Sequence, residues 1–193
     1  MLSEEIRIMK KTVLTFGLIG GVVIAVLTLG TLPFAKKIGF DKSMFVGYTV
    51  MVLSFMMVFF GIRSYRDNIG GGTISFGRAF AIGALIVLIT SVCYVVNWEI
   101  MYFKFMPNFV NDYSNYMIEK MRAAGATQPA IDAKLQEMKQ LKQMLDNPFL
   151  NAAMSFIEPL PVGLIITLIS SLILRKRGKG PSPSNEPAQQ MAA

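Results

Sequence analysis

Long uncharged apolar segments alternate with polar ones along this chain, which is the pattern of a protein that crosses a membrane several times. Residues 12–35, 43–62 and 79–98 contain no charged side chain. As a helix rising about 1.5 Å per residue, each can span a hydrocarbon core of roughly 30 Å. A fourth apolar segment covers residues 150–174. The pattern predicts an all-α integral membrane protein, a bundle of four transmembrane helices.

The one sizeable polar segment, residues 99–149, separates the third and fourth spans. Apolar side chains recur there at helical spacing on both sides of Gly125, which predicts a helical hairpin. About forty residues cannot build a strong core alone, so we expect the hairpin to dock onto the bundle. Its apolar faces could meet each other, lie on the membrane, or bind a partner. These apolar positions are Phe109, Tyr113, Tyr116, Met117 and Met121, then Ile131, Leu135, Met138, Leu141 and Leu145.

The fourth span contains a charged residue and two prolines, Glu158, Pro159 and Pro161. Each proline removes a backbone N–H donor, and the residue before a proline is disfavoured in the α conformation. We therefore predict a break in the fourth helix near residues 158–161. Because lipid offers no partner for the carbonyls that such a break frees, we expect this stretch to face protein or water.

Basic residues are concentrated in short flanks on one side of the predicted bundle. Four spans place both termini on that side, and short cytoplasmic flanks carry the excess of lysine and arginine in membrane proteins. We therefore predict a cytoplasmic N-terminus over residues 1–11, a cytoplasmic tail over residues 178–193 and an extracytoplasmic hairpin. The tail is rich in proline, serine and glycine without an apolar period, which predicts disorder.

Composition agrees with a membrane protein and excludes several chemistries. Hydrophobic residues make up 53% of the 193 residues and charged residues 16%, against about 25% charged in soluble domains. Histidine is absent and Cys93 is the single cysteine, so we predict no disulfide within the chain, no metal site and no cofactor. The net charge of +7 follows the flanks of the spans and does not indicate a nucleic-acid partner.

Polar residues on the hairpin side of the spans form the main candidate site. Asn97 and Glu99 end the third span on the side that also holds Glu158. A carboxylate in apolar surroundings is costly unless it is paired, protonated or hydrated. We hypothesise a polar cluster of these three residues, neutralised by Lys36 or Lys37, that takes a proton, a cation or the polar head of a ligand. The alternative is a kink at the membrane interface whose glutamate reaches water.

Three aromatic residues, Tyr94, Trp98 and Tyr102, stand where the third span ends. Aromatic side chains with a polar tip gather at the boundary between lipid and water. We interpret these three residues as an interfacial aromatic belt.

Glycine forms two further patterns. Gly17 and Gly21 make a G-x-x-x-G pair, a helix-packing face that can join two copies of a chain, although such pairs also arise by chance in membrane helices. The glycine-rich stretch 69–78 lacks the G-x-x-x-x-G-K-[ST] spacing of a phosphate-binding loop. We interpret it as a turn in which Ser75 caps the third helix.

Three stretches together carry a resemblance to a known family: Gly72–Phe80, Tyr94–Glu99 and Glu158–Gly163. They resemble the bacterial membrane family called domain of unknown function 4199, and the resemblance covers roughly residues 10–177. It implies a multi-pass protein of the bacterial inner membrane with four helices and a long extracytoplasmic segment between the third and fourth spans. It implies no activity, because none is established for that family.

Three classes of function stay open. The favoured one is a non-catalytic bundle that binds a partner or supports a membrane complex, because no nucleophile stands beside a base at a recognisable spacing. The alternative is a subunit of an oligomeric transporter or channel for ions or small solutes, since four spans without an inverted repeat make a poor lone transporter. The third is a lipid-modifying enzyme with Glu99 and Glu158 as acid and base. The expected partners are the lipid bilayer and either a second copy or another protein that meets the hairpin.

Overall fold

The structure is a computed structural model that describes residues 2–176, except the side chains of residues 2, 3 and 35–37. The tail predicted over residues 178–193 lies outside the described residues. Apart from one isolated β-bridge between Ile74 and Lys176, the described elements are helical. They are α1 (Leu2–Thr31), the 3-10 turn η1 (Leu32–Phe34), α2 (Ala35–Asn68), α3 (Phe76–Ile100), the π-helical turn η2 (Met101–Phe105), α4 (Phe109–Ala123), α5 (Gln128–Leu145), α6 (Pro148–Ile157) and α7 (Pro159–Leu174).

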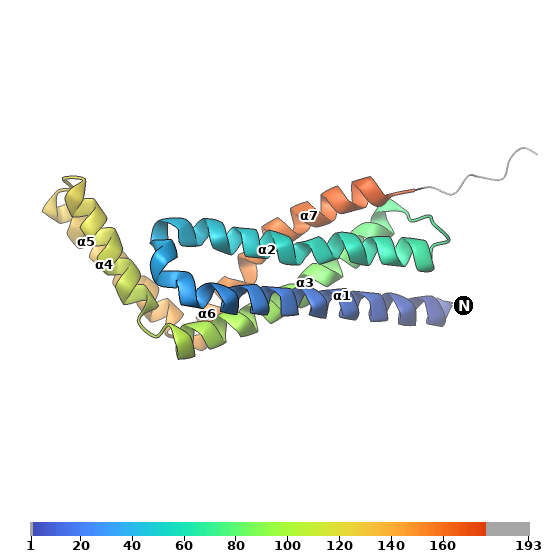
Figure 1. The fold of residues 1–193 in the computed structure, drawn as a ribbon, viewed down its shortest axis with the longest axis horizontal. Coiled ribbons are helices and arrows are strands. Elements are labelled where there is room, and N and C mark those ends of the chain that lie inside the picture. Colours follow the sequence, from blue (N-terminus) through green and yellow to red (C-terminus); the bar gives the residue numbers. More distant parts are fainter. Residues whose placement is uncertain (1, 177–193) are drawn as a thin grey trace, which may run out of the picture.

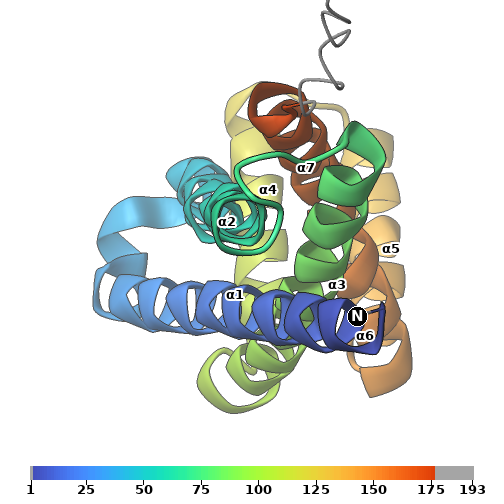
Figure 2. The same cartoon turned by 90° about the vertical axis from the view of Figure 1, so that its right-hand side faces the viewer.

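The long helices form one bundle with the hairpin α4–α5 at one end (Figure 1). Both described chain ends lie at the opposite end, and Figure 2 shows α1, α2, α3 and α7 grouped around a common core. Four helical segments are long and apolar enough to cross a membrane: Glu4–Phe34, Ile38–Asn68, Phe76–Phe105 and Pro148–Leu174. The predicted all-α, four-span membrane fold is confirmed.

The helices extend further than the uncharged segments from which the spans were predicted. α1 begins at Leu2, so residues 2–11 belong to the same helix as the first span, and α2 begins at Ala35 rather than at residue 43. Gly39 is not helical, with φ 66° and ψ 169°, and it kinks α2 between the first four residues and the long helix that follows. Glycine adopts this backbone conformation without steric cost. Charged residues at the ends of a span continue the helix because helical hydrogen bonds do not require apolar side chains.

The packing of α7 is inverted relative to that of a water-soluble protein. Its buried face is made of small and hydroxylated residues, whereas its exposed face consists of large apolar ones. Small residues let membrane helices approach closely, and lipid accepts the large apolar side chains outside. The buried set includes Gly163, Thr167, Ser170 and Ser171, and the exposed set Leu164, Ile165, Leu168, Ile169, Leu172 and Ile173.

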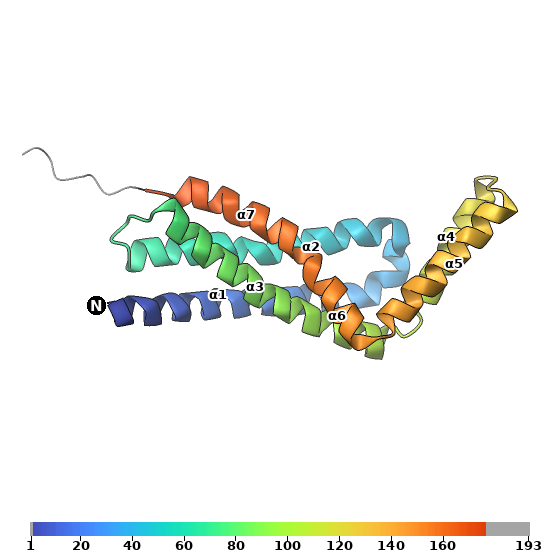
Figure 3. The ribbon, with the colours of Figure 1, turned by 180° about the vertical axis from the view of Figure 1, so that it is seen from behind.

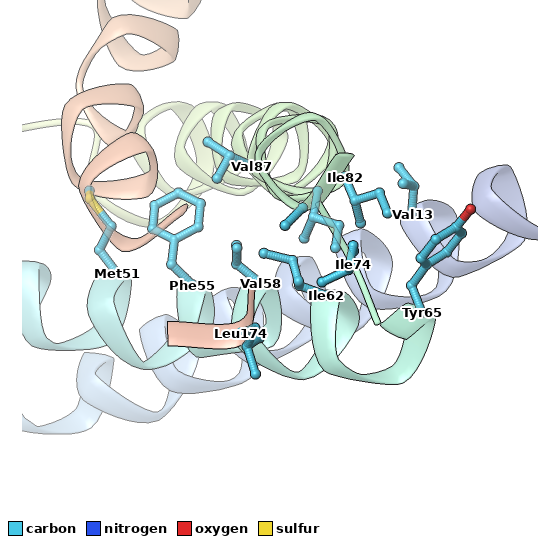
Figure 4. Close-up of a cluster of buried hydrophobic side chains, with 12 residues drawn as sticks. Val13, Met51, Phe55, Val58, Ile62, Tyr65, Ile74, Ile82, Val87 and Leu174 are labelled. Carbon is cyan, nitrogen blue, oxygen red and sulfur yellow. The ribbon is translucent and has the colours of Figure 1, made fainter. Parts of the chain in front are cut away.

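Between the helices lies an apolar core to which α1, α2, α3 and α7 all contribute (Figure 4). Phe55, Val58 and Ile62 of α2 are fully buried there. Val87 of α3 also belongs to this core, and Gly163 of α7 sits directly against it. A side chain at position 163 would overlap Val87, so glycine sets the distance between these two helices.

Gly17 and Gly21 face α3 of the same chain. A Cβ added at Gly21 would lie 2.5 Å from the Cβ of Cys93, and one at Gly17 would lie 2.7 Å from Ile89. The Thr90 hydroxyl also donates a hydrogen bond of 3.1 Å to the Gly17 carbonyl. The glycine pair therefore lies within the bundle, where it brings α1 against α3.

The proline break is a kink between α6 and α7, visible in Figures 1 and 3. Glu158 keeps the α conformation, with φ −57° and ψ −50°, although it precedes Pro159. Its N–H still donates to the Met154 carbonyl at 3.3 Å. The α region before a proline is disfavoured rather than forbidden. The kink follows from the N–H groups that Pro159 and Pro161 lack.

The two helices of the hairpin pack their apolar stripes against each other. Val110 and Ile118 of α4 are buried, as are Ile131, Met138 and Leu145 of α5. Of the three roles considered for these faces, the structure shows mutual packing. Leu135, which the sequence pattern placed in the same stripe, is instead exposed.

The hairpin docks against the first turns of α2. The Phe40 ring lies 5.4 Å from the Tyr113 ring and 5.3 Å from the Tyr116 ring, measured between centroids. Next to this contact, the Lys120 ammonium is 2.7 Å from the Asp41 carboxylate. The ion pair is largely exposed and therefore weak, so the aromatic contact is the main attachment here.

Gly21→Ala tests the contact between α1 and α3. The added methyl group overlaps Cys93, and overpacking of this kind costs about 1–3 kcal/mol. We expect a lower unfolding temperature in detergent. Gly30→Ala is the matched control on the same helix, because nothing lies within 4 Å of that position. Equal unfolding temperatures for the two variants would contradict the packing described here.

Phe40→Ala tests the docking of the hairpin, and we expect faster amide hydrogen exchange throughout α4.

Lys120→Gln should have a smaller effect on the docking of the hairpin because the ion pair is exposed. Asp41 raises the pKa of the Lys120 ammonium through their hydrogen bond. The contribution of this pair to stability is therefore complete from neutral pH up to the ordinary lysine pKa of about 10.4, and it is lost as the pH rises through the raised pKa of the folded protein. Unfolding of wild type and Lys120→Gln should therefore converge above that pH, and a gap that persists there would contradict this role.

Candidate functional site: a polar junction between α3 and α6

Two aromatic side chains of α3 and one of the turn η2 that follows it each donate a hydrogen bond, to acceptors that lie between the end of α5 and the start of α7. Tyr94, Trp98 and Tyr102 are spaced by four residues, so they lie along one face of the helix. Their acceptors occur in reverse order along the chain, because α6 runs antiparallel to α3. The bonds run from the Tyr94 hydroxyl to Glu158 Oε2 (2.9 Å), from Trp98 Nε1 to Asn151 Oδ1 (2.9 Å), and from the Tyr102 hydroxyl to Asp146 Oδ1 (3.0 Å).

Asn151 is the centre of this junction and is fully buried. Its Oδ1 accepts from Trp98 and from the Ser155 hydroxyl at 3.2 Å, while its Nδ2 donates to the Leu145 carbonyl at 2.9 Å. A buried amide is tolerated only when its donors and acceptors are used. Asn151 therefore connects α3, the end of α5 and α6 through one side chain.

The position of Asn151 depends on how α6 begins. Asn147 caps the helix, with its Oδ1 accepting from the N–H groups of Phe149 (3.0 Å) and Leu150 (3.2 Å). Pro148 occupies the first turn, where a missing N–H has no consequence. Asparagine followed by proline thus fixes the start of α6 and the direction in which Asn151 projects.

At the end nearest the hairpin, the junction contacts the base of the hairpin. Tyr102, Val110 and Leu145 form a small buried cluster, and the Tyr102 hydroxyl reaches Asp146. The Lys142 ammonium beside Asp146 lowers the pKa of that carboxyl, and the Tyr102 hydrogen bond acts in the same direction. Asp146 is therefore an ionised acceptor at neutral pH.

At the other end, next to the kink, the junction includes Glu158, which lies on the surface of the bundle. The neighbouring exposed side chains are apolar, with Met154 at 43% and Ile157 at 65% exposure. Along the helix axis Arg175 is about 25 Å away and the start of α6 about 15 Å away in the other direction. Glu158 therefore lies inside the candidate membrane span Pro148–Leu174, with the Tyr94 hydroxyl as its hydrogen-bond donor.

The other members of the hypothesised cluster lie elsewhere around α3. Glu99 follows Tyr94 by five residues, about 140° around the helix, and one of its carboxylate oxygens is buried without a hydrogen-bond partner among the described side chains. Asn97 is half-buried. No hydrogen bond between described side chains links Asn97, Glu99 and Glu158. The side chains of Lys36 and Lys37 lie outside the described residues.

The interpretation of the three aromatic residues as a belt at the lipid boundary missed their contacts within the protein, and Asn151 was not among the predicted site residues. Tyr102 is buried, and Trp98 and Tyr94 are half-buried against protein. A signal for this arrangement was present, since Asn151 and Ser155 are polar residues spaced by four in an otherwise apolar helix. Polar residues at that spacing mark the inward face of a membrane helix.

Comparison with known proteins places the whole junction within one family. The family model described as Protein of unknown function (DUF4199) matches residues 15–176. The chain belongs to this family. The match to DUF4199 includes the hairpin and the junction residues on α3 and α6, and it confirms the resemblance found in the sequence. No curated protein and no solved structure matches the chain.

Asn151→Ala removes three hydrogen bonds and leaves the Trp98 indole N–H without an acceptor. We expect a loss of about 2 kcal/mol in unfolding free energy. The fluorescence of Trp98, the single tryptophan, should change as well. Asn115→Ala, at an exposed position of α4, is the matched control and should leave both unchanged. An Asn151→Ala variant with wild-type stability and emission would contradict the central role of this amide.

Proposed function

We propose that this chain is a non-catalytic protein of the bacterial inner membrane, with both termini in the cytoplasm, whose hairpin α4–α5 stands outside and binds another protein of a membrane complex. The attachment of the hairpin carries this proposal. The aromatic contact at Phe40 holds α4, and the Asn151 junction holds the end of α5. An arm fixed at two places is suited to present a surface in a constant orientation.

The exposed side of α5 supports a protein partner rather than lipid. Its apolar stripe is used against α4, and the opposite face carries polar and charged residues such as Gln136, Glu137 and Gln140. A surface of this kind offers hydrogen bonds and ion pairs, which are typical of the polar parts of protein interfaces.

The charge distribution supports the proposed orientation. The end of the bundle that holds both described chain ends also holds basic residues that include Arg63, Arg66, Arg78 and Arg175. An excess of such residues in short flanks is typical of the cytoplasmic side. Catalysis is not part of the proposal. Glu99 and Glu158 project from α3 and from the kink in different directions, which does not support a shared role as acid and base.

A transporter or channel subunit is the alternative, and one observation favours it. Glu158 places a carboxyl among exposed apolar side chains inside the candidate span Pro148–Leu174, and ionisable groups within membrane spans often mark ion or proton pathways. The test is ion flux into liposomes that contain the purified protein. Flux that is lost in Glu158→Gln and kept in the hairpin variant Glu119→Gln would establish the transporter or channel in place of the non-catalytic, partner-binding protein.

Cysteine cross-linking tests orientation and partner binding together. In a Cys93→Ser background, Gln140→Cys places a thiol on the face of α5 opposite Met138, and Asn68→Cys places one at the other end of the bundle. A membrane-impermeant thiol cross-linker added to intact spheroplasts should react with Gln140→Cys and capture one discrete protein. Asn68→Cys should react only after lysis. Reaction of Asn68→Cys in intact cells would reverse the orientation, and a Gln140→Cys product that contains only this chain would replace the protein partner by a second copy.

A further inference from the structure

A groove lies at the end of the bundle that holds both described chain ends. Its volume is about 500 Å³, and its walls come from the start of α1, the loop between α2 and α3, and the residues after α7. Two backbone hydrogen bonds between Ile74 and Lys176, of 3.0 and 3.1 Å, fasten the end of α7 beside the start of α3. The groove is therefore built by three segments that are distant in the sequence.

The charges that line the groove favour an anion. Arg78 and Lys176 contribute two positive charges and Glu5 one negative charge, which leaves a net charge of +1. Arg78 Nη2 and Glu5 Oε2 are 3.8 Å apart, with both side chains about half exposed. Such a long, exposed pair is weak, so the guanidinium, which has five N–H donors, keeps donors for a second acceptor. Tyr65 and Thr73 add hydroxyl groups to the wall.

The position of the groove relative to the apolar parts of α3 and α7 indicates the source of such an anion. Arg78 directly precedes the apolar part of α3, and Arg175 directly follows that of α7. The groove therefore lies at the edge of the hydrocarbon layer, where lipid phosphates are found. A second groove of about 450 Å³ adjoins it on the other side of Ile74 and Ser75, lined by Phe76 and Arg175. Phe76 is 37% exposed and gives an apolar wall beside the basic one.

We propose that this groove binds a phosphate group, presented by the headgroup of an anionic phospholipid or by a free phosphate anion. Arg78 and Lys176 bind the phosphate oxygens, and Phe76 lies along the adjoining lipid chain when the source is a lipid. Arginine binds phosphate through parallel N–H donors, and basic grooves between membrane helices on the cytoplasmic side are known to take anionic headgroups. Glu5 opposes binding and limits its strength.

The full-length protein in phosphatidylcholine vesicles provides the first test. Electron paramagnetic resonance with trace spin-labelled phosphatidylglycerol or phosphatidylcholine gives the preference of the protein for the anionic lipid, at about 0.15 M salt to screen long-range charge. We expect Arg78→Gln to lower this preference about tenfold, as for the loss of a charge-assisted hydrogen bond. Glu5→Gln should raise it. Arg63→Gln is the matched control, because Arg63 carries the same charge at the same end, pairs with Asp67 and does not line the groove.

A second arm distinguishes the two sources of phosphate. The unfolding temperature in detergent is measured with inorganic phosphate and with chloride at equal ionic strength. A rise with phosphate that Arg78→Gln abolishes, without a lipid preference in the first arm, identifies a free anion. A lipid preference without that rise identifies a headgroup.

Two results would overturn the proposal. One is an equal loss for Arg78→Gln and Arg63→Gln, which would reveal a diffuse field of charge instead of a site. The other is the absence of any effect of Arg78→Gln and Glu5→Gln in both arms.

Discussion

The buried amide of Asn151 is the interaction on which the arrangement of this molecule depends. Lipid cannot satisfy a polar group, so a side chain of this kind must find its partners within the protein. Here the partners come from α3, from the end of α5 and from the next turn of α6. One residue thereby joins the base of the hairpin to the bundle, seven residues before Glu158 and the proline kink.

The junction also supplies a hydrogen-bond donor to the Glu158 carboxyl, which lies inside a candidate membrane span. Tyr94 stands one helical turn from Trp98, so the helix that presents the indole to Asn151 also presents a hydroxyl to Glu158. The kink at Pro159 carries α7 away from the line of α6 and leaves Glu158 at the surface rather than within the core. The partner-binding hypothesis and the transporter hypothesis thus concern opposite ends of the same set of hydrogen bonds: the hairpin end at Asp146 and the kink end at Glu158.

The spans were predictable from sequence because the membrane imposes a simple rule on side-chain composition, and α7 with its long uncharged run is the clearest case. Helix ends were less predictable, since α1 and α2 continue through charged residues once their backbone hydrogen bonds have begun. Glu158 was found because a charge in an apolar segment is conspicuous. Its partner Tyr94 was not, because the pairing depends on how α6 is rotated, and that rotation is set by Asn151 and its distant partners.

α1 and α3 run in the same direction and meet through Gly17 and Gly21, although α2 separates them in the chain. During synthesis on the ribosome, the first helix enters the bilayer well before the third. It must remain there without its main neighbour until α3 has been inserted. The glycine surface of α1 is therefore covered only after about half of the 193 residues have been synthesised, because α3 ends at Ile100.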